Sequence, residues 1–187
     1  MLLLLLLALP VEQASTSVFP LAREGSTVCS SVAIATHHLL TASHCLANHV
    51  VGDDAGVTVK RGEQLYTTIV VRVWGDWDLA ILSAPGLTMI PMPVAKAKPS
   101  ILDELVAIGY AYGFDHHIYT FHRYEGDITR PDHVTKFTLY GPAAPAMSGA
   151  PVVNGSGQLV SILQETDFNI LTWGARYEQV LLTILSR

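Results

Sequence analysis

The chain has 187 residues, of which 50% are hydrophobic and only 14% are charged. This length suffices for one substantial domain, or for two small barrels that share an interface. Eleven basic residues stand against 16 acidic ones, for a formal net charge of −5. The composition therefore gives no electrostatic support for nucleic-acid binding, and we expect no such partner.

The N-terminus carries a run of six leucines, residues 2–7, whose length is typical of a signal-peptide hydrophobic region and too short to span a bilayer. It predicts a signal peptide or leader over residues 1–14, with cleavage after Ala14. We therefore expect a secreted or extracytoplasmic protein with no stable membrane insertion after leader removal. However, no basic residue precedes the leucines. Loss of part of the leader, or excision from a longer viral polyprotein, would explain this equally well.

After the leader, short runs rich in β-branched and apolar residues alternate with turn signals, which is typical of an all-β sandwich or a pair of barrels. In chain order the runs are residues 27–41, 57–73, 79–82, 105–111, 118–124, 134–140, 150–153, 159–164 and 170–174. Residues 91–99, with three prolines and two lysines, predict a linker between two halves. Residues 177–185 space their apolar side chains at three and four, which predicts a helix.

Three short segments offer a base, an acid and a nucleophile in that chain order. They are residues 41–45 (TASHC), 76–82 (DWDLAIL) and 146–151 (AMSGAP). A serine hydroxyl needs an imidazole to take its proton and a carboxylate to hold that imidazole in the right tautomer. The order His, Asp, Ser occurs in double β-barrel proteases, whereas hydrolases with a nucleophile elbow run Ser, Asp, His.

These segments resemble the trypsin/chymotrypsin-like serine peptidases, and the resemblance runs from about residue 26 to about residue 180. It implies two six-stranded antiparallel β-barrels with the active site in the cleft between them, and a short C-terminal helix. The peptidase domain would cover residues 15–187, with the N-terminal barrel at about 15–92 and the C-terminal barrel at about 98–187. A polypeptide is the implied substrate, no cofactor is implied, and we expect a monomer.

The resemblance assigns His44 as general base and acid, Asp78 as the acid that orients it, and Ser148 as the nucleophile. TASHC differs from the family's Thr-Ala-Ala-His-Cys by one small-for-small change. Asp76 is a rival carboxylate that would face the same way on a strand. The family pattern favours Asp78, because its aspartate stands directly before an apolar run that contains alanine. We interpret Asp76 as a solvated turn residue.

Cys29 and Cys45 are the two cysteines of the chain. Cys45 directly follows the histidine, as in the bridge that the resembling family places beside its catalytic histidine. The resemblance thus implies a disulfide and an oxidising compartment, with a pair of reduced, buried thiols as the alternative. No metal is expected, because His37 and His38 would point to opposite faces of a strand and no set of carboxylates or thiolates completes a zinc shell.

Two positions depart from the family pattern. The family builds its oxyanion hole from the backbone N–H of the serine and of a glycine two residues earlier, so Ala146 and Ser148 are the predicted donors. Alanine resists the φ values that glycine adopts freely. Either residues 142–146 reach the same N–H direction by another route, or the hole forms only when substrate binds. The residue before the serine is Met147 rather than the aspartate of digestive members, so we expect no trypsin-style zymogen switch.

Counting along the predicted strand 159–164 places Gln164, Glu165 and Thr166 where the family lines its first pocket and pairs with the substrate backbone. The sequence therefore predicts a serine endopeptidase that acts through an acyl-enzyme on Ser148. Two alternatives stay open. One is a catalytically silent protease fold that serves as a binding module, for which the missing glycine is the direct support. The other is a viral or phage protease that processes its own polyprotein.

Overall fold

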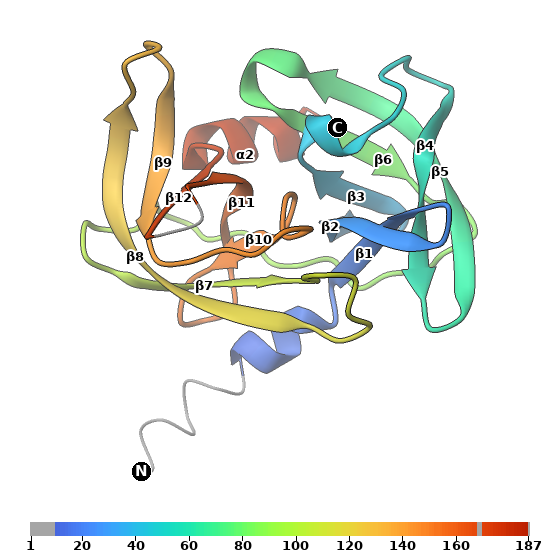
Figure 1. Cartoon of the computed structure of the whole chain (residues 1–187), viewed down its shortest axis with the longest axis horizontal. Coiled ribbons are helices and arrows are strands. Elements are labelled where there is room, and N and C mark those ends of the chain that lie inside the picture. Colours follow the sequence, from blue (N-terminus) through green and yellow to red (C-terminus); the bar gives the residue numbers. More distant parts are fainter. Residues whose placement is uncertain (1–9, 168–169, 187) are drawn as a thin grey trace.

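The computed structural model describes residues 10–167 and 170–186, which form two closed antiparallel β-barrels (Figure 1). The first barrel has the strand order β1-β2-β3-β6-β5-β4 and the second β10-β11-β12-β9-β8-β7. Closing each sheet on itself leaves neither barrel with a free edge strand along its full length. The predicted all-β class with two six-stranded barrels is confirmed.

The strands of the first barrel are β1 (Val18–Arg23), β2 (Ser26–Ala35), β3 (His38–Thr41), β4 (Asp54–Arg61), β5 (Gln64–Trp74) and β6 (Leu79–Ser83). Those of the second are β7 (Glu104–Gly109), β8 (Ile118–Thr129), β9 (Thr135–Tyr140), β10 (Pro151–Val153), β11 (Leu159–Thr166) and β12 (Leu171–Gly174). Helix α2 (Tyr177–Leu185) follows the last strand and has the bounds that the sequence predicts.

Strand β1 is absent from the sequence prediction, which also merges two hairpins into single runs. β1 contains Pro20, and proline inside a run weakens a strand prediction. Yet β1 pairs with both β2 and β4 and so closes the first barrel. The predicted run 27–41 turns between β2 and β3, and the run 57–73 turns between β4 and β5.

An apolar cluster between the barrels holds them against each other. It combines Leu40 and Ile81 from the first barrel with Ile108 and Ile162 from the second and Val180 from α2. The other two clusters lie inside the barrels, one in each. Since burying apolar area stabilises a contact at roughly 25 cal/mol per Å², this cluster fixes the relative position of the two walls of any site between them.

The predicted linker at residues 91–99 connects the barrels without forming a regular strand. Its backbone is nevertheless bonded on both sides. The N–H of Met92 donates to Ala33 of β2 at 2.9 Å, and the N–H of Leu159 of β11 donates to Pro93 at 2.8 Å. The connection is therefore a packed crossover rather than a loose tether.

Most of the predicted leader, residues 1–9, lies outside the described residues. The described part, residues 10–15, is helical, and Ala14 is 6% exposed within the cluster between the barrels. Cleavage after Ala14 stays a prediction, and the cut would fall inside this helical segment. Among residues 10–167 and 170–186, no helix has the length and apolar character needed to cross a membrane.

Candidate active site

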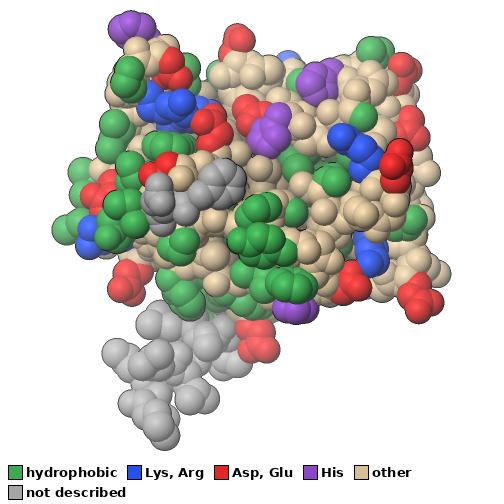
Figure 2. Space-filling model, viewed as in Figure 1, with side chains coloured by type: hydrophobic (Ala, Val, Ile, Leu, Met, Phe, Trp, Pro, Cys, Tyr) green, Lys and Arg blue, Asp and Glu red, His purple; other side chains and the backbone are tan. Residues whose placement is uncertain are grey.

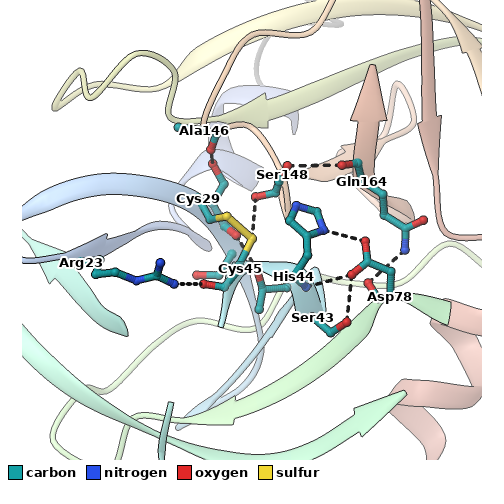
Figure 3. The surroundings of a disulfide bond; sticks show 12 residues. Arg23, Cys29, Ser43, His44, Cys45, Asp78, Ala146, Ser148 and Gln164 are labelled. Atoms are coloured by element: carbon teal, nitrogen blue, oxygen red, sulfur yellow. Dashed lines mark hydrogen bonds and ion pairs between the residues drawn. A yellow bond between two sulfur atoms is a disulfide. The ribbon is translucent and has the colours of Figure 1, made fainter. Parts of the chain in front are cut away.

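Three short irregular segments carry the predicted catalytic residues to the junction of the barrels. The 3₁₀ turn η1 (Ser43–Cys45) follows β3 and holds His44. The 3₁₀ turn η2 (Gly75–Trp77) ends at Asp78, directly before β6. Ser148 lies in the loop between β9 and β10 of the second barrel. In Figure 3 the His44 imidazole lies between the Asp78 carboxylate and the Ser148 side chain.

Asp78 makes the principal contacts of His44. Its Oδ2 lies 2.7 Å from His44 Nδ1, and its Oδ1 accepts the His44 backbone N–H at 2.9 Å. The same Oδ1 accepts the Ser43 hydroxyl, also at 2.9 Å. With Nδ1–H donated to the carboxylate, Nε2 is left as the basic nitrogen, which is the tautomer that a general base requires.

The pair shifts both pKa values in the directions that suit such a role. The pKa of His44 is raised above 6.5, chiefly by its hydrogen bond to Asp78 and against the opposing effect of burial. Burial acts to raise the pKa of Asp78, but hydrogen bonds from His44 and Ser43 outweigh it and lower that pKa. Asp78 is therefore ionised near neutral pH and favours the imidazolium that a proton transfer would create.

Asp78 is not on a strand, contrary to the expectation that it would face the same way as Asp76. Asp76 lies exposed within η2, whereas Asp78 follows that turn with a left-handed φ of 49°. From this position the Asp78 carboxylate bonds Ser43 and His44 of η1. The residue-by-residue alternation of a strand therefore does not apply here, and only the second carboxylate reaches His44.

The Ser148 hydroxyl is near His44 but is not bonded to it. Its Oγ donates to the backbone carbonyl of Gln164 in β11 at 3.3 Å. Within the described residues, no hydrogen bond joins Ser148 Oγ to His44. Hydrogen bonds between nucleophile and base are often long or misaligned before substrate binds, and rotation about one side-chain bond changes this contact.

The two predicted oxyanion donors lie in a loop with a strained alanine. Ala146 has a φ of 71°, the left-handed conformation that glycine adopts at little cost. Alanine thus takes the conformation that it was expected to resist, rather than residues 142–146 following another route. The role of the two N–H groups as oxyanion donors stays a prediction. No described residue accepts the backbone N–H of Ala146 or of Ser148. Both donors are therefore available to a ligand.

The loop is held in place by Ser30 of β2, in the other barrel. The Ser30 hydroxyl donates to the Ala146 carbonyl at 3.1 Å, and the Ser30 N–H donates to the Ser148 carbonyl at 2.8 Å. The same hydroxyl accepts the N–H of Tyr110 at 2.9 Å. By engaging two carbonyl groups of the serine loop, these bonds tie the loop to the first barrel.

Gly149 permits the close approach of the serine loop to the first barrel. Its φ is 82°, and a Cβ at this position would lie 2.1 Å from the Ser30 carbonyl oxygen and 2.2 Å from Thr41 Oγ1. No side chain can occupy that space unless backbone moves. Gly149 is therefore required both by its conformation and by its neighbours.

Cys29 and Cys45 form a disulfide that ties β2 to η1, beside His44 (Figure 3). The pair of reduced thiols is thus set aside. Among the residues that the structure describes, Cys29, His44 and Cys45 form a group of three potential metal ligands whose atoms lie within 4.8 Å of one another. Both of its sulfurs are consumed by the disulfide, so this group does not fit a metal ion.

Comparison with known proteins agrees with this architecture. A family model for a trypsin-like peptidase domain matches residues 25–162. The chain belongs to the trypsin-like peptidase family. No curated protein sequence matches it.

Solved structures similar to this trypsin-like peptidase include two forms of one mycobacterial protease. The inactive form of the Rv3671c protease has a TM-score of 0.80 at 20% identity, with 95% of this chain and 91% of that chain covered. The active form of the Rv3671c protease from M. tuberculosis has a TM-score of 0.77 at 21% identity, with 94% and 82% covered. At this level of identity the likeness shows the fold.

A pocket of about 270 Å³ opens beside Ser148 in this trypsin-like peptidase. It is lined by the serine loop, residues 143–148, and by residues 163–166 of β11, which include the predicted substrate-binding Gln164, Glu165 and Thr166. Glu165 is bonded to Arg130 at 2.6 Å and lies 3.4 Å from Lys136. Burial acts to raise the pKa of Glu165, but these cations outweigh it and lower that pKa.

Glu165 is thus paired with two cations of its own chain. Its charge is compensated within the chain. The wider surface is mixed in the same way, since Figure 2 shows acidic and basic side chains interspersed over one face.

Several residues that shape the site are not identified by the sequence analysis. Ser43 stands inside the TASHC motif, where the family has alanine, and this difference is the sequence feature that could have identified it. Ser30, Arg130 and Lys136 act through contacts between segments far apart in the chain. No local pattern marks such residues.

Proposed function

We propose that this peptidase is a serine endopeptidase with Ser148 as nucleophile, His44 as general base and Asp78 as the acid that orients His44. One observation carries the proposal. Asp78 bonds both the side chain and the backbone of His44, on the side of the ring away from Ser148. This arrangement leaves Nε2 basic and directed to the serine side of the cleft.

The reaction would proceed through an acyl-enzyme. Ser148 Oγ attacks the scissile carbonyl carbon while its proton passes to His44 Nε2. The carbonyl oxygen becomes an oxyanion, which the N–H groups of Ala146 and Ser148 would bind. As the C–N bond breaks, His44 returns the proton to the leaving amine. Water, deprotonated by His44, then attacks the ester, releases the carboxylic acid and restores the Ser148 hydroxyl.

β11 provides an edge along which substrate could add as a strand. Its pairing with β10 begins at Leu159 and ends at Ile162, whereas its pairing with β12 continues to Thr166. The carbonyl of Gln164 therefore faces the cleft, where Ser148 Oγ occupies it in this structure. A substrate N–H bonded to this carbonyl would free the hydroxyl to turn to His44.

Two features of the chain favour export from the cytoplasm. The leucine run predicts a leader, and a disulfide forms stably in oxidising compartments. We therefore propose that the protein acts outside the reducing cytoplasm, on polypeptides that it meets there.

A specific observation favours a second candidate, a silent protease fold that binds peptides without cleaving them. The Ser148 hydroxyl is bonded to Gln164 and not to His44. In such a protein this bond would persist when peptide binds.

Hydrolysis of a peptide library separates the two candidates. The purified protein and its Ser148→Ala variant are incubated with fluorogenic peptides that cover all side-chain classes before the scissile bond, and products are located by mass spectrometry. We expect internal cleavage by the wild type, and a loss of at least about 1,000-fold in the variant. A wild type that binds peptides yet releases no product would support the binding module.

A further inference from the structure

Gln164 joins the two walls of the site. Its side chain reaches from β11 of the second barrel to the first barrel, where Nε2 donates to the carbonyls of Trp77 at 2.6 Å and Asp78 at 3.0 Å. Its own backbone carbonyl accepts the Ser148 hydroxyl at 3.3 Å. The residue is only 3% exposed, and in Figure 3 its amide points to the Asp78 segment.

Lys136 of β9 sets the orientation of this amide. Its ammonium donates to Gln164 Oε1 at 2.8 Å, and its side chain is 11% exposed. Only one orientation satisfies all the groups: the oxygen faces the ammonium, and the NH₂ faces two carbonyl oxygens. In the reverse orientation, Oε1 would face the carbonyl oxygens of Trp77 and Asp78, and the NH₂ group would face the Lys136 ammonium, so no hydrogen bond could form. Lys136 is in turn placed by Glu165, which Arg130 holds from the tip of the β8–β9 hairpin.

The segment that Gln164 holds has an uncommon conformation. Asp78 has a φ of 49°, and non-glycine residues persist in this region only when the surrounding structure fixes them. The carboxylate and the N–H of Asp78 are already engaged, by His44, Ser43 and Gly75. Its carbonyl accepts from Ser43 N–H and from Gln164, so the amide is the contact that anchors this peptide to the opposite barrel.

We propose that Gln164 is a positioning residue for Asp78: its amide, oriented by Lys136, fixes the backbone carbonyls of Trp77 and Asp78 so that the Asp78 carboxylate faces His44 Nδ1. This role of the side chain is additional to the place of Gln164 among the residues that line the pocket beside Ser148. Its kinetic consequence rests on the proposed function, whereas its effect on His44 does not.

The test replaces Gln164 by methionine, which keeps the length and the buried volume of the side chain and removes the amide. We expect kcat to fall by about tenfold to 100-fold, because small displacements of catalytic groups have effects of this size. KM should stay nearly constant, since the substrate-facing backbone of β11 is unchanged. The matched control is Gln64→Met, an exposed glutamine at the start of β5 that is remote from the site.

The pKa of His44, measured by NMR titration of its imidazole, is the decisive readout. The charged groups that face His44 are Asp78, Glu165 and Lys136. Because the bond to Asp78 is the largest cause of the raised value, loosening it should lower the pKa of His44 in Gln164→Met. The acid limb of kcat/KM should move to lower pH by the same amount. Gln64→Met should match the wild type.

The titration requires no hydrolysis, so it tests this role even if the wild type proves inactive. A folded Gln164→Met protein with the wild-type pKa of His44 would overturn the proposal, and so would an effect on KM alone. Should Gln164→Met fail to fold, as judged by circular dichroism, Gln164→Asn takes its place. That shorter amide cannot span the same distance, and it should lower the pKa of His44 in the same way.

Discussion

Three residues at the site have a left-handed backbone conformation, and each one is held in it by contacts with a different neighbour. Ala146 and Gly149 flank the serine with φ values of 71° and 82°, and Asp78 has 49°. A non-glycine residue in this region costs roughly 1 to 2 kcal/mol. Hydrogen bonds offset this cost: Ser30 donates to the carbonyl of Ala146, and Gln164 donates to the carbonyl of Asp78. Gly149 avoids it, and no other residue type would fit there.

A pair of glycine substitutions tests this account of Gly149. Gly149→Ala and Gly25→Ala introduce the same side chain at nearly the same φ, 82° and 81°, but no atom lies within 4 Å of the new Cβ at Gly25. We expect Gly25→Ala to lower the free energy of unfolding by about 1 kcal/mol through backbone strain. Gly149→Ala should lower it by at least about 3 kcal/mol, because the Cβ meets backbone.

The measurement is urea denaturation of both variants and the wild type, followed by fluorescence. Equal losses of stability would mean that the serine loop is not packed against β2 and β3 in the way described. Such a result would also remove the structural reason for glycine after Ser148.

At the residue scale, the sequence points to candidate residues only where the pattern is local. His44, Asp78 and Ser148 each stand in a short motif, and the structure brings all three to one junction. Their catalytic roles stay predictions. The amide contacts of Gln164 and the support from Ser30 and Lys136 depend on pairs 28 to 116 residues apart. Such contacts exist only once both barrels are closed, so a local pattern cannot reveal them.

At the scale of elements, short strands and turns determine where the site residues lie. Runs of β-branched residues predicted most strands, and helix α2 has the predicted bounds. β1 was not predicted because Pro20 weakens its pattern. Its partner β2 follows directly, but β4, with which it closes the barrel, lies farther along the chain. The turns η1 and η2 were not predicted either, since three-residue 3₁₀ segments carry no periodic pattern. These turns are the elements that hold His44 and Asp78.

The disulfide is the covalent element of this region, and its loss should be measurable. It joins residues 16 apart in sequence, for which chain entropy predicts about 3 kcal/mol of stabilisation. For a chain of this size we therefore expect the double variant Cys29→Ser, Cys45→Ser to melt about 6 to 12 °C below the wild type. Differential scanning calorimetry with and without reductant measures this.

Reductant should lower the melting temperature of the wild type and leave that of the double variant unchanged. A double variant with the same melting temperature as the oxidised wild type would show that the disulfide contributes no stability. The chain-entropy argument would then fail for this protein.

At the scale of the whole molecule, the two barrels act as the two walls of one site. The first carries His44 and Asp78, and the second carries Ser148 and the β11 edge. The apolar cluster between them and the bonded crossover at residues 91–99 fix their relation. The number of barrels followed from the resemblance. The closing pairs β1 with β4 and β7 with β10 join strands that are not consecutive, and composition does not determine them.

Labelling with a fluorophosphonate probe tests the central claim most directly. The probe reacts with a serine only when a base activates the hydroxyl and donors stabilise the oxyanion-like adduct. The purified, disulfide-bonded protein and its Ser148→Ala variant are treated in parallel, and adducts are located by mass spectrometry. The account predicts one adduct per chain, on Ser148, and none in the variant. A folded wild type that stays unlabelled would contradict it.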